Sequence, residues 1–481
     1  MTRRLLHIHM RPADPTPARS SAISPLRTQQ ETHMPRVIRT LSRTLSRSMH
    51  HLLVFAMLLP LAACSLDSVL DVSVPGRVRE EALADPALAP TMVASVISDL
   101  ECAWNNYAAA ASLMSDEFMQ ASGNLNQRNW GSRRVTADDP NMATATCRAA
   151  YGIYTTLHTA RFQAEDIFAR LDAFTDAQVA NRTALKATVR AYGAYALVAL
   201  GEGFCEMVLD GGPIITPTKV LEAAEARFTE AITLATTANN QDILNMALVG
   251  RARVRLDLKN YAGALADARL VPLTYVKNAT RDESDTRRYN AMCEFMACPQ
   301  WRHATVAPAY RNVTWQGVVD PRVQVATIGT LTFDNVQVWY YPSAKHRSRG
   351  YPVVLSSGVQ ARLFVAEAAA RTGDLATARQ LINNMHVAAG IPGYDLTNSE
   401  TQAQVIAQVI EERRREMFVE GAFRFNDHLR LTGTPQEVPF KGTPTSILHP
   451  SGIDGTGVPY GTTTCFPLPL VESANNPNTA G

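Results

Sequence analysis

The residue with the clearest chemistry in the sequence is Cys64, which follows Leu61, Ala62 and Ala63 at the end of a short apolar run. A cysteine thiol is a nucleophile that can accept acyl chains, and the small residues before it give a processing enzyme access to the backbone. The run begins at Leu52 and is about a dozen residues long, whereas a membrane-spanning helix needs about 20. This length is typical of the apolar region of a secretory signal peptide.

The arrangement around Cys64 resembles the bacterial lipobox, in which the thiol is diacylated, for example with palmitate, and cleavage leaves the cysteine as the new N-terminus. We therefore predict that residues 1–63 are a leader that is removed, and that Cys64 carries a lipid anchor. An ordinary signal peptide, or a buried helix with an accidental cysteine, is the alternative. Arginines before the apolar run supply the positive charge that such a signal needs: Arg36, Arg39, Arg43 and Arg47.

Removal of the leader changes the charge of the protein. The whole chain has 46 Lys and Arg, 44 Asp and Glu, and a formal net charge of +2. The leader holds nine Arg and two acidic residues, so residues 64–481 have 37 basic and 42 acidic residues and a net charge of −5. This balance argues against a nucleic-acid partner. The remaining 418 residues can form a large core as one domain or as two intermingled lobes.

Two acidic residues have a spacing that could support catalysis. Glu412 and Glu416 are one helical turn apart, and two carboxylates about 5–10 Å apart across a sugar can cleave a glycosidic bond. Arg413, Arg414 and Arg415 lie between them, and we expect these arginines to keep both carboxylates ionised, without a proton donor. We therefore interpret the segment as a structural salt-bridge helix, with a surface glycoside hydrolase as the weaker alternative.

The sequence contains no other recognisable catalytic motif. There is no G-x-S-x-G, H-E-x-x-H or phosphate-binding P-loop. We accordingly predict a protein that is not an enzyme and that needs no metal or other cofactor.

Aromatic residues beside polar ones favour a binding function instead. Sugars stack their C–H faces on Trp or Tyr rings, while amides, carboxylates and arginines hold the hydroxyl groups. The polar segment Asn124–Trp130 combines these groups, although each aromatic residue could equally belong to the core. The candidate ligand-binding residues are Asn126, Arg128, Trp130, Trp301, Trp339 and Tyr341.

Helical periodicity dominates the chain that would position these residues. In the first helix Trp104 and Tyr107 occupy apolar positions and are expected to be buried. Tyr151, Tyr154, His158 and Phe162 form a stripe on the second helix, which we interpret as core packing. One or two helices are expected at Ala89–Met119, and further helices at Cys147–Phe174, Asn181–Val208, Thr218–Ala238 and Asp242–Leu258.

One helical pair is repeated in the sequence. Residues Ala247–Ala268 match residues Ala361–Ile382 at a constant offset of 114. Ala252 then pairs with Ala366, Asn260 with Asp374 and Ala264 with Ala378, which places small residues where two helices touch. This is the pattern of the tetratricopeptide hairpin.

We therefore predict a mostly α fold with a tetratricopeptide-like scaffold at about 148–270 and 358–392. An irregular part with loops and short strands, at about 85–145, 271–357 and 431–481, would bind the ligand. Within it, Gly123–Asn141 is predicted to be a loop, Trp301–Leu355 to hold short strands, and the chain after Arg430 to be loop that wraps the body or is disordered.

The cysteines after Cys64 number six, and an even number in an exported protein permits disulfides. Their pairing does not follow from the sequence, although Cys293 and Cys298 are close enough for a local loop. The six are Cys102, Cys147, Cys205, Cys293, Cys298 and Cys465.

Four segments resemble the SusD/RagB family of surface lipoproteins. EERRREMFVEGAFRFNDHLRL (Glu411–Leu431) is similar to the family's ER-x-x-EL-x-x-EG-x-R-W-x-D-L-x-R stretch, and FPLPLVESANNPN (Phe466–Asn478) to its C-terminal F-P-I-P-x-x-E…NPN ending. LMSDEFM and VAEAAARTGDLATARQLIN resemble its early Ser-Asp-Glu element and its last helical repeat. The matching positions of the first segment, which we regard as structural, are Glu412, Arg413, Glu416, Glu420, Gly421, Arg424, Asp427 and Arg430.

The chain departs from the family pattern at two positions. Phe425 replaces the usual Trp, and Gln360 replaces a common Glu before the last repeat. The i,i+4 spacing of Glu420 and Arg424 permits an ion pair if both lie on one helix.

The resemblance implies a single SusD-like domain over residues 64–481, lipid-anchored in the outer membrane and exposed at the cell surface. It implies that the protein binds a nutrient, an oligosaccharide or a peptide, and passes it unaltered to a SusC-like, TonB-dependent transporter. A periplasm-facing tetratricopeptide adaptor that binds protein partners is the alternative, and fluorescent labelling of intact cells separates the two.

Overall fold

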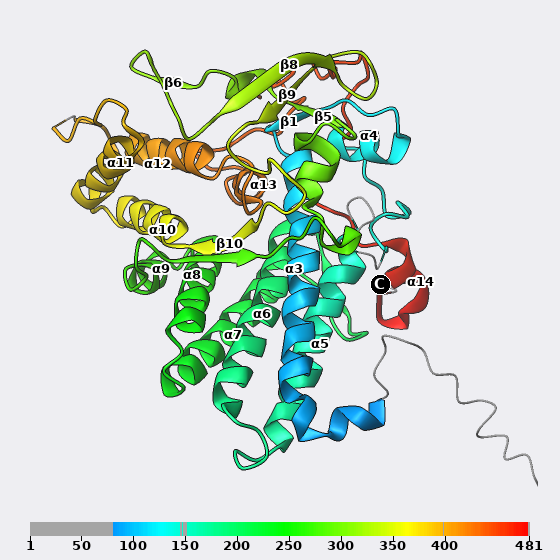
Figure 1. Ribbon diagram of the computed structural model, residues 1–481. Helices are drawn as coiled ribbons and strands as arrows, with labels where there is room; N and C mark the ends of the chain where they lie inside the picture. The colour runs from blue at the N-terminus through cyan, green and yellow to red at the C-terminus, as the bar shows by residue number, and fades with distance from the viewer. Residues whose placement is uncertain (1–79, 145–146, 148–151, 398, 480–481) are drawn as a thin grey trace, which may run out of the picture. The chain divides into compact units, whose positions relative to one another are not determined.

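The computed structural model describes residues 80–144, 147, 152–397 and 399–479 of the protein. Helices are the main secondary structure in these ranges (Figure 1). The mostly α prediction is confirmed, while Cys64 and the predicted leader lie outside the described residues. None of the helices in these ranges is both long and apolar enough to cross a membrane. The helices are α3 (Ala89–Met114), α4 (Leu125–Gly131), α5 (Tyr154–Ala173), α6 (Arg182–Gly203), α7 (Pro217–Thr237), α8 (Gln241–Asp257), α9 (Tyr261–Ala268), α10 (Gly358–Arg371), α11 (Leu375–Ala389), α12 (Gln402–Glu416), α13 (Phe423–Arg430) and α14 (Leu470–Asn475).

The helices from α5 to α12 form a stack in which neighbours along the chain pack together, and α10 continues the stack by packing on α8 and α9 (Figure 1). The internal repeat corresponds to the pairs α8–α9 and α10–α11. Asn260 and Asp374, which the repeat aligned, both cap the second helix of their pair by accepting a backbone N–H, from Gly263 and Thr377. The aligned alanines are fully buried, so small side chains let the helices approach: Ala252, Ala264, Ala366 and Ala378.

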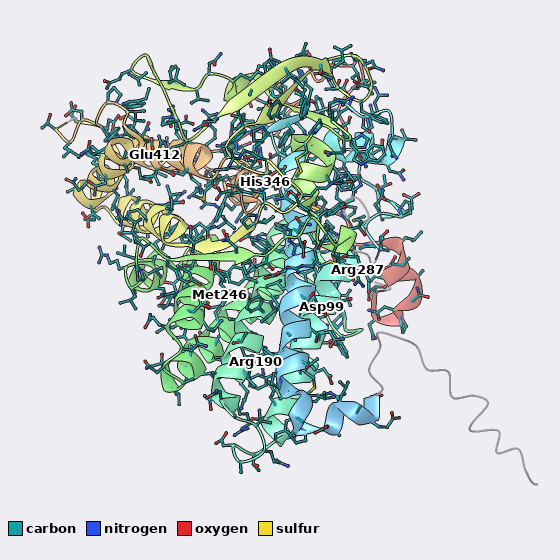
Figure 2. All side chains as sticks on the ribbon, in the orientation of Figure 1. Asp99, Arg190, Met246, Arg287, His346 and Glu412 are labelled. Carbon is teal, nitrogen blue, oxygen red and sulfur yellow. A yellow bond between two sulfur atoms is a disulfide. The ribbon has the colours of Figure 1, made fainter. Side chains whose placement is uncertain are left out.

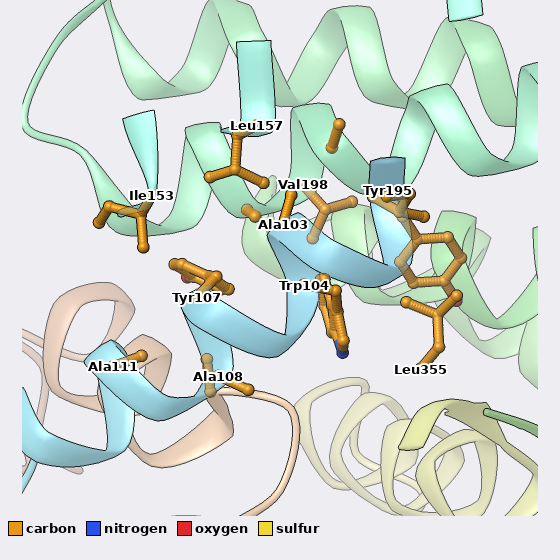
Figure 3. Packing of buried hydrophobic residues seen from close by; sticks show 14 of the residues in the cluster. Ala103, Trp104, Tyr107, Ala108, Ala111, Ile153, Leu157, Tyr195, Val198 and Leu355 are labelled. Carbon is orange, nitrogen blue, oxygen red and sulfur yellow. The ribbon is translucent and has the colours of Figure 1, made fainter. Parts of the chain in front are cut away.

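The long helix α3 runs through the core. Trp104 and Tyr107 are completely buried, as predicted, and pack among side chains of α5, α6 and β10 (Figure 3). The Trp104 ring meets Tyr195 edge-on, with centroids 5.6 Å apart. Burying rings of this size contributes much of the stability of such a core.

The strands within the described ranges form only two-stranded antiparallel sheets. Most of them lie between Trp301 and Leu355 or just beyond, as predicted. The pairs are β1 (Phe118–Gln120) with β5 (Ala304–Val306), β2 (Met207–Val208) with β3 (Ile214–Ile215), β4 (Val276–Ala279) with β10 (Val353–Ser357), β6 (Thr314–Trp315) with β7 (Val318–Val319), and β8 (Val325–Leu331) with β9 (Val338–Pro342).

A buried ion pair joins the end of α3 to α13. Asp116 accepts two hydrogen bonds from Arg424, at 2.8 and 2.6 Å, and a third from the Tyr310 hydroxyl at 2.9 Å. The side chains of Asp116 and Arg424 are 0% and 8% exposed. Burial opposes the charge of Asp116, but Arg424 outweighs this effect and holds the pKa of Asp116 well below its usual range.

A second buried cluster ties α12 and α13 to α10. Arg413 donates to Glu367 at 2.6 Å and to Asp427 at 2.9 and 2.7 Å. Arg430 donates to both of these carboxylates as well. Each buried charge of this cluster therefore has an opposite partner, which offsets the cost of removing it from water.

Glu412 and Glu416 share one helix face, as predicted, and both accept from Arg322, at 2.7 and 3.1 Å. Glu412 is completely buried and also contacts His386 at 2.8 Å. Figure 2 shows Glu412 on α12, within the layer that this helix shares with α11 and α13.

The ion pair that the spacing of Glu420 and Arg424 would permit on a single helix does not form. Helix α12 ends at Glu416, and the turn that follows has positive φ angles at Val419, Gly421 and Ala422. The two side chains therefore do not share a helix. Glu420 pairs instead with Lys345 at 2.7 Å.

The C-terminal segment wraps the body, which was one of our two predictions. Phe466 is fully buried and packs against Phe204, Phe425 and Trp130, with ring centroids 5.2–5.6 Å apart. Phe425 is also completely buried. Disulfides join Cys102 to Cys147, Cys205 to Cys465 and Cys293 to Cys298, and the last is the predicted local loop.

Replacing one partner of the buried ion pair should destabilise the protein strongly. For Asp116→Asn we expect the free energy of unfolding to fall by about 3–5 kcal/mol, because Arg424 is left as an uncompensated buried charge. Chemical denaturation measures this change. Lys219→Ala, which removes an exposed pair with Glu222, is the control and should have little effect. Equal effects of the two substitutions would contradict the assignment.

Glu117 should make stability depend on pH. Burial raises its pKa from 4.5 to about 7, against opposing hydrogen bonds from the Val419 N–H and a serine hydroxyl. The folded state therefore binds this proton more tightly, and the stability it gives is present below pH 4.5 and is lost as pH rises to about 7. In the unsubstituted protein the free energy of unfolding should fall by on the order of 3 kcal/mol over this pH range because of Glu117, and in Glu117→Gln this fall should be absent. A profile parallel to that of the unsubstituted protein would contradict this.

Candidate ligand-binding surface

Trp301 presents its ring at the surface just before β5. Its side chain is 42% exposed, and its Nε1–H donates to Glu294 at 3.1 Å. The ring lies parallel to that of His303, with centroids 5.8 Å apart and an interplanar angle of 7°. One face of the indole is thus supported from beneath.

Phe333, at the turn between β8 and β9, completes an aromatic cluster. It is 39% exposed, and its ring centroid lies 6.0 Å from Trp301 and 4.7 Å from His303. A Cβ added at Gly123 would lie 3.6 Å from the Phe333 ring, so the cluster reaches the chain just before α4. We call Trp301 and Phe333, together with Asn124, Asn126 and Arg128 of the segment that follows Gly123, the Trp301 surface.

His303 supports this surface from inside. It is 5% exposed, and its Nδ1 lies 2.8 Å from the Ser122 hydroxyl, which also accepts the Asn124 N–H. Burial lowers the pKa of His303 to about 4, so the ring is neutral at neutral pH. The support is therefore an uncharged aromatic face.

The predicted loop Gly123–Asn141 is wrong in its first part, because Leu125–Gly131 forms α4. The Asn124 side chain caps this helix by accepting the N–H groups of Asn126 and Gln127. Its buried side uses Gln127, Trp130 and Gly131, a combination without a clear apolar period. The sequence therefore concealed a helix that holds Asn126 and Arg128 at half-exposed positions.

Arg128 is held by the C-terminal segment. Its Nη2 donates to the Thr456 hydroxyl at 2.6 Å, and Thr456 donates to Asp454 at 2.7 Å. Gln120 of β1 donates to the same carboxylate at 2.9 Å. Burial opposes the charge of Asp454, but these hydrogen bonds outweigh it and lower its pKa. The guanidinium is therefore fixed in place on α4.

The other predicted ligand residues lie elsewhere. Trp130 is completely buried and donates to Asp139 at 2.8 Å, and Trp339 is 2% exposed and donates to the Met296 carbonyl at 2.8 Å. Neither ring is open to a ligand, so these two predictions are corrected. Tyr341 is half-buried and stacks on Trp339 at 4.3 Å.

Glu412 and Glu416 are not placed to act together on a sugar substrate. Glu412 lies in the core, and burial raises the pKa of Glu416 above its usual value, which differs from our expectation for that residue. Within the described part of the chain, no three His, Cys, Asp or Glu side chains group in a way that could hold a metal ion.

Phe333 and His303 help to form the aromatic cluster, but neither was predicted from the sequence. Phe333 ends the strand-like run VQVATIGTLTF, and an aromatic residue at the tip of a hairpin was the available signal. His303 lies two residues after Trp301, but its stacking on the Trp301 ring depends on the antiparallel pairing of β5 with β1, which the sequence does not reveal.

Residues 362–449 match the SusD family, described as SusD_RagB. They cover most of α10, the helices α11 to α13 and the start of the C-terminal segment. A comparison with curated proteins finds no match.

The fold is similar to solved structures over most of the chain. A SusD superfamily protein from Bacteroides vulgatus superposes with a TM-score of 0.61 at 15% identity, covering 82% of this chain and 98% of that one. A SusD-like carbohydrate-binding protein from the same species gives 0.61 at 14% identity, with 82% and 97% covered. Surface glycan-binding protein A from Bacteroides uniformis gives 0.59 at 14% identity, with 82% and 98% covered.

Proposed function

We propose that this chain acts as a SusD family protein and that its Trp301 surface binds an oligosaccharide. The match of residues 362–449 to the SusD family and the similarity of the fold support this proposal. The observation that carries the proposal is the exposed Trp301 ring, supported by His303 and flanked by Phe333. Two of the similar structures are named as carbohydrate- or glycan-binding proteins, and this supports a sugar over a peptide.

The chemistry of the Trp301 surface suits a sugar. The apolar C–H face of a pyranose ring stacks on an aromatic face, and the hydroxyl groups need donors and acceptors at the edge. Asn124 and Asn126 supply amides, and Arg128 supplies a guanidinium held by Thr456. Because His303, Ser122 and Thr456 hold these groups before a ligand arrives, little ordering entropy is lost on binding.

We also propose that the ligand is bound and not cleaved, because the two acidic residues of α12 are not available to a substrate. The acidic pair of α12 is engaged with Arg322, and Glu412 has no exposed surface to offer a substrate. The ligand would be held and passed on unchanged. The appearance of new reducing ends after incubation with glycans would support a glycoside hydrolase instead.

The proposed setting is the cell surface. Cys64 would carry acyl chains that anchor the protein in the outer membrane, and a SusC-like, TonB-dependent transporter would receive the ligand. The short apolar run before Cys64 and the family resemblance support this setting. Labelling of intact cells and co-purification with a barrel protein test it.

Trp301→Ala should weaken the binding of the glycan identified on an array by roughly tenfold or more, because the stacking face is lost. Phe333→Ala should have a smaller effect in the same direction. Calorimetric titration gives the affinity, and thermal unfolding should show that both variants remain folded, since both side chains are partly exposed.

Leu270→Ala is the matched control, because Leu270 is a large exposed side chain, 67% accessible, at the end of α9. It should leave the affinity unchanged. Binding of the glycan by Trp301→Ala as tightly as by the unsubstituted protein would refute the proposed surface, and a peptide hit on the array in place of a glycan would redirect the ligand class.

A further inference from the structure

A hollow lies between α5 and α14, and none of its lining residues belongs to the Trp301 surface. Its volume is about 690 Å³, which falls within the range of about 300–1,000 Å³ typical of small-molecule sites. The lining comes from α5, from the turn after β2, and from α14. The two helices lie beside one another in Figure 1.

An exposed aromatic ring stands in this hollow. We expected Tyr154, His158 and Phe162 to form a core stripe on α5, but only part of it is core. Tyr154 is 4% exposed, whereas Phe162 is 57% exposed, so the prediction for Phe162 is corrected; Tyr151 lies outside the described residues. His158 lies about one helical turn before Phe162 and Tyr154 about two. The rings of Tyr154 and His158 are 4.4 Å apart, whereas Phe162 offers an open face.

Two carboxylates in the hollow are fixed by less exposed partners. Arg161, which is 6% exposed, donates to both oxygens of Asp210, at 3.1 and 2.6 Å, while the Asp210 side chain remains 64% exposed. The Tyr154 hydroxyl donates to Glu472 at 2.9 Å. Each carboxylate oxygen has further lone pairs, so both groups can accept hydrogen bonds from hydroxyls of a ligand.

The charges of the hollow favour a ligand without negative charge. Arg161 is balanced by Asp210, and Glu472 adds one negative charge. Burial, assisted by Arg161, lowers the pKa of His158 to about 4, so this ring is neutral at neutral pH. An acidic sugar would meet carboxylates with no free cation to offset them.

We propose that the hollow between α5 and α14 is a second saccharide subsite, selective for neutral sugars, with Phe162 as the stacking face and Asp210 and Glu472 as acceptors. This inference rests on the proposed function, because it takes the protein to be a glycan binder. Two subsites on one chain would increase the avidity for a long glycan that reaches both.

The test uses saturation-transfer NMR of the purified protein with the methyl glycosides of glucose, galactose, mannose, xylose and N-acetylglucosamine. In a Trp301→Ala/Phe333→Ala background, which removes the first surface, at least one glycoside should still bind. Adding Phe162→Ala should weaken that binding by roughly fivefold or more. Adding Leu270→Ala instead should not change it. Methyl glucuronide should bind the background variant less well than methyl glucoside.

The outcomes separate the two proposals. Binding that is lost in the background variant would refute the second subsite and leave the Trp301 surface intact. Binding that is unchanged in the background variant but lost on Phe162→Ala alone would refute the Trp301 surface and support the hollow. A background variant that binds regardless of Phe162→Ala, or an unsubstituted protein that binds no glycoside, would overturn the subsite.

Discussion

The buried ion pair between Asp116 and Arg424 is the constraint on which the arrangement of this protein depends. It joins positions 308 residues apart in the sequence. Removing both charges from water is costly, and the cost is offset only when the geometry is complete. Tyr310 and His428, at 2.9 and 3.6 Å from the Asp116 carboxylate, complete it here. The pair therefore favours one path of the chain over others, because any other packing would bury these charges without partners.

The ion pair also positions the Trp301 surface. Asp116 and Glu117 lead directly into β1, where Phe118 pairs with Val306 and Gln120 with Ala304 of β5. The Ala121 N–H then donates to the His303 carbonyl at 2.8 Å. Each step passes through backbone hydrogen bonds, so the aromatic cluster rests on the same rigid base as the buried charges. A surface supported in this way can be preformed for its ligand.

The sequence was most informative where periodicity and small residues repeat. The alignment of Asn260 with Asp374 identified two helix caps with the same role, because a capping side chain needs a fixed spacing to the N–H that it binds. The density of opposite charges between Glu411 and Arg430 led us to interpret this segment as structural, and Arg413 and Arg430 are paired with Glu367 and Asp427 in the fold. The helix α4 was not predicted, since its buried side consists of Gln127, Trp130 and Gly131 and has no apolar period.

The Trp301 surface was harder to predict because the exposure of a side chain depends on tertiary contacts. Trp301 and Trp130 are both aromatic residues in polar sequence, yet one is 42% exposed and the other is fully buried against Phe466. The partner that covers Trp130 comes from a distant part of the chain, as does the Ser122 that orients His303 beneath Trp301. Likewise, the partners of Arg424 and Glu420 were set by a turn with positive φ angles, which residue spacing alone does not reveal.

The most direct measurement is a crystal structure of the protein with a bound neutral oligosaccharide. The account predicts a sugar ring stacked on the open face of Trp301, with hydroxyl groups near Asn124, Asn126 or Arg128. It also predicts that β1, β5 and His303 keep the positions they have without ligand. An ordered sugar elsewhere on the protein with the Trp301 face bare, or a Trp301 ring that must leave His303 to admit the sugar, would contradict it.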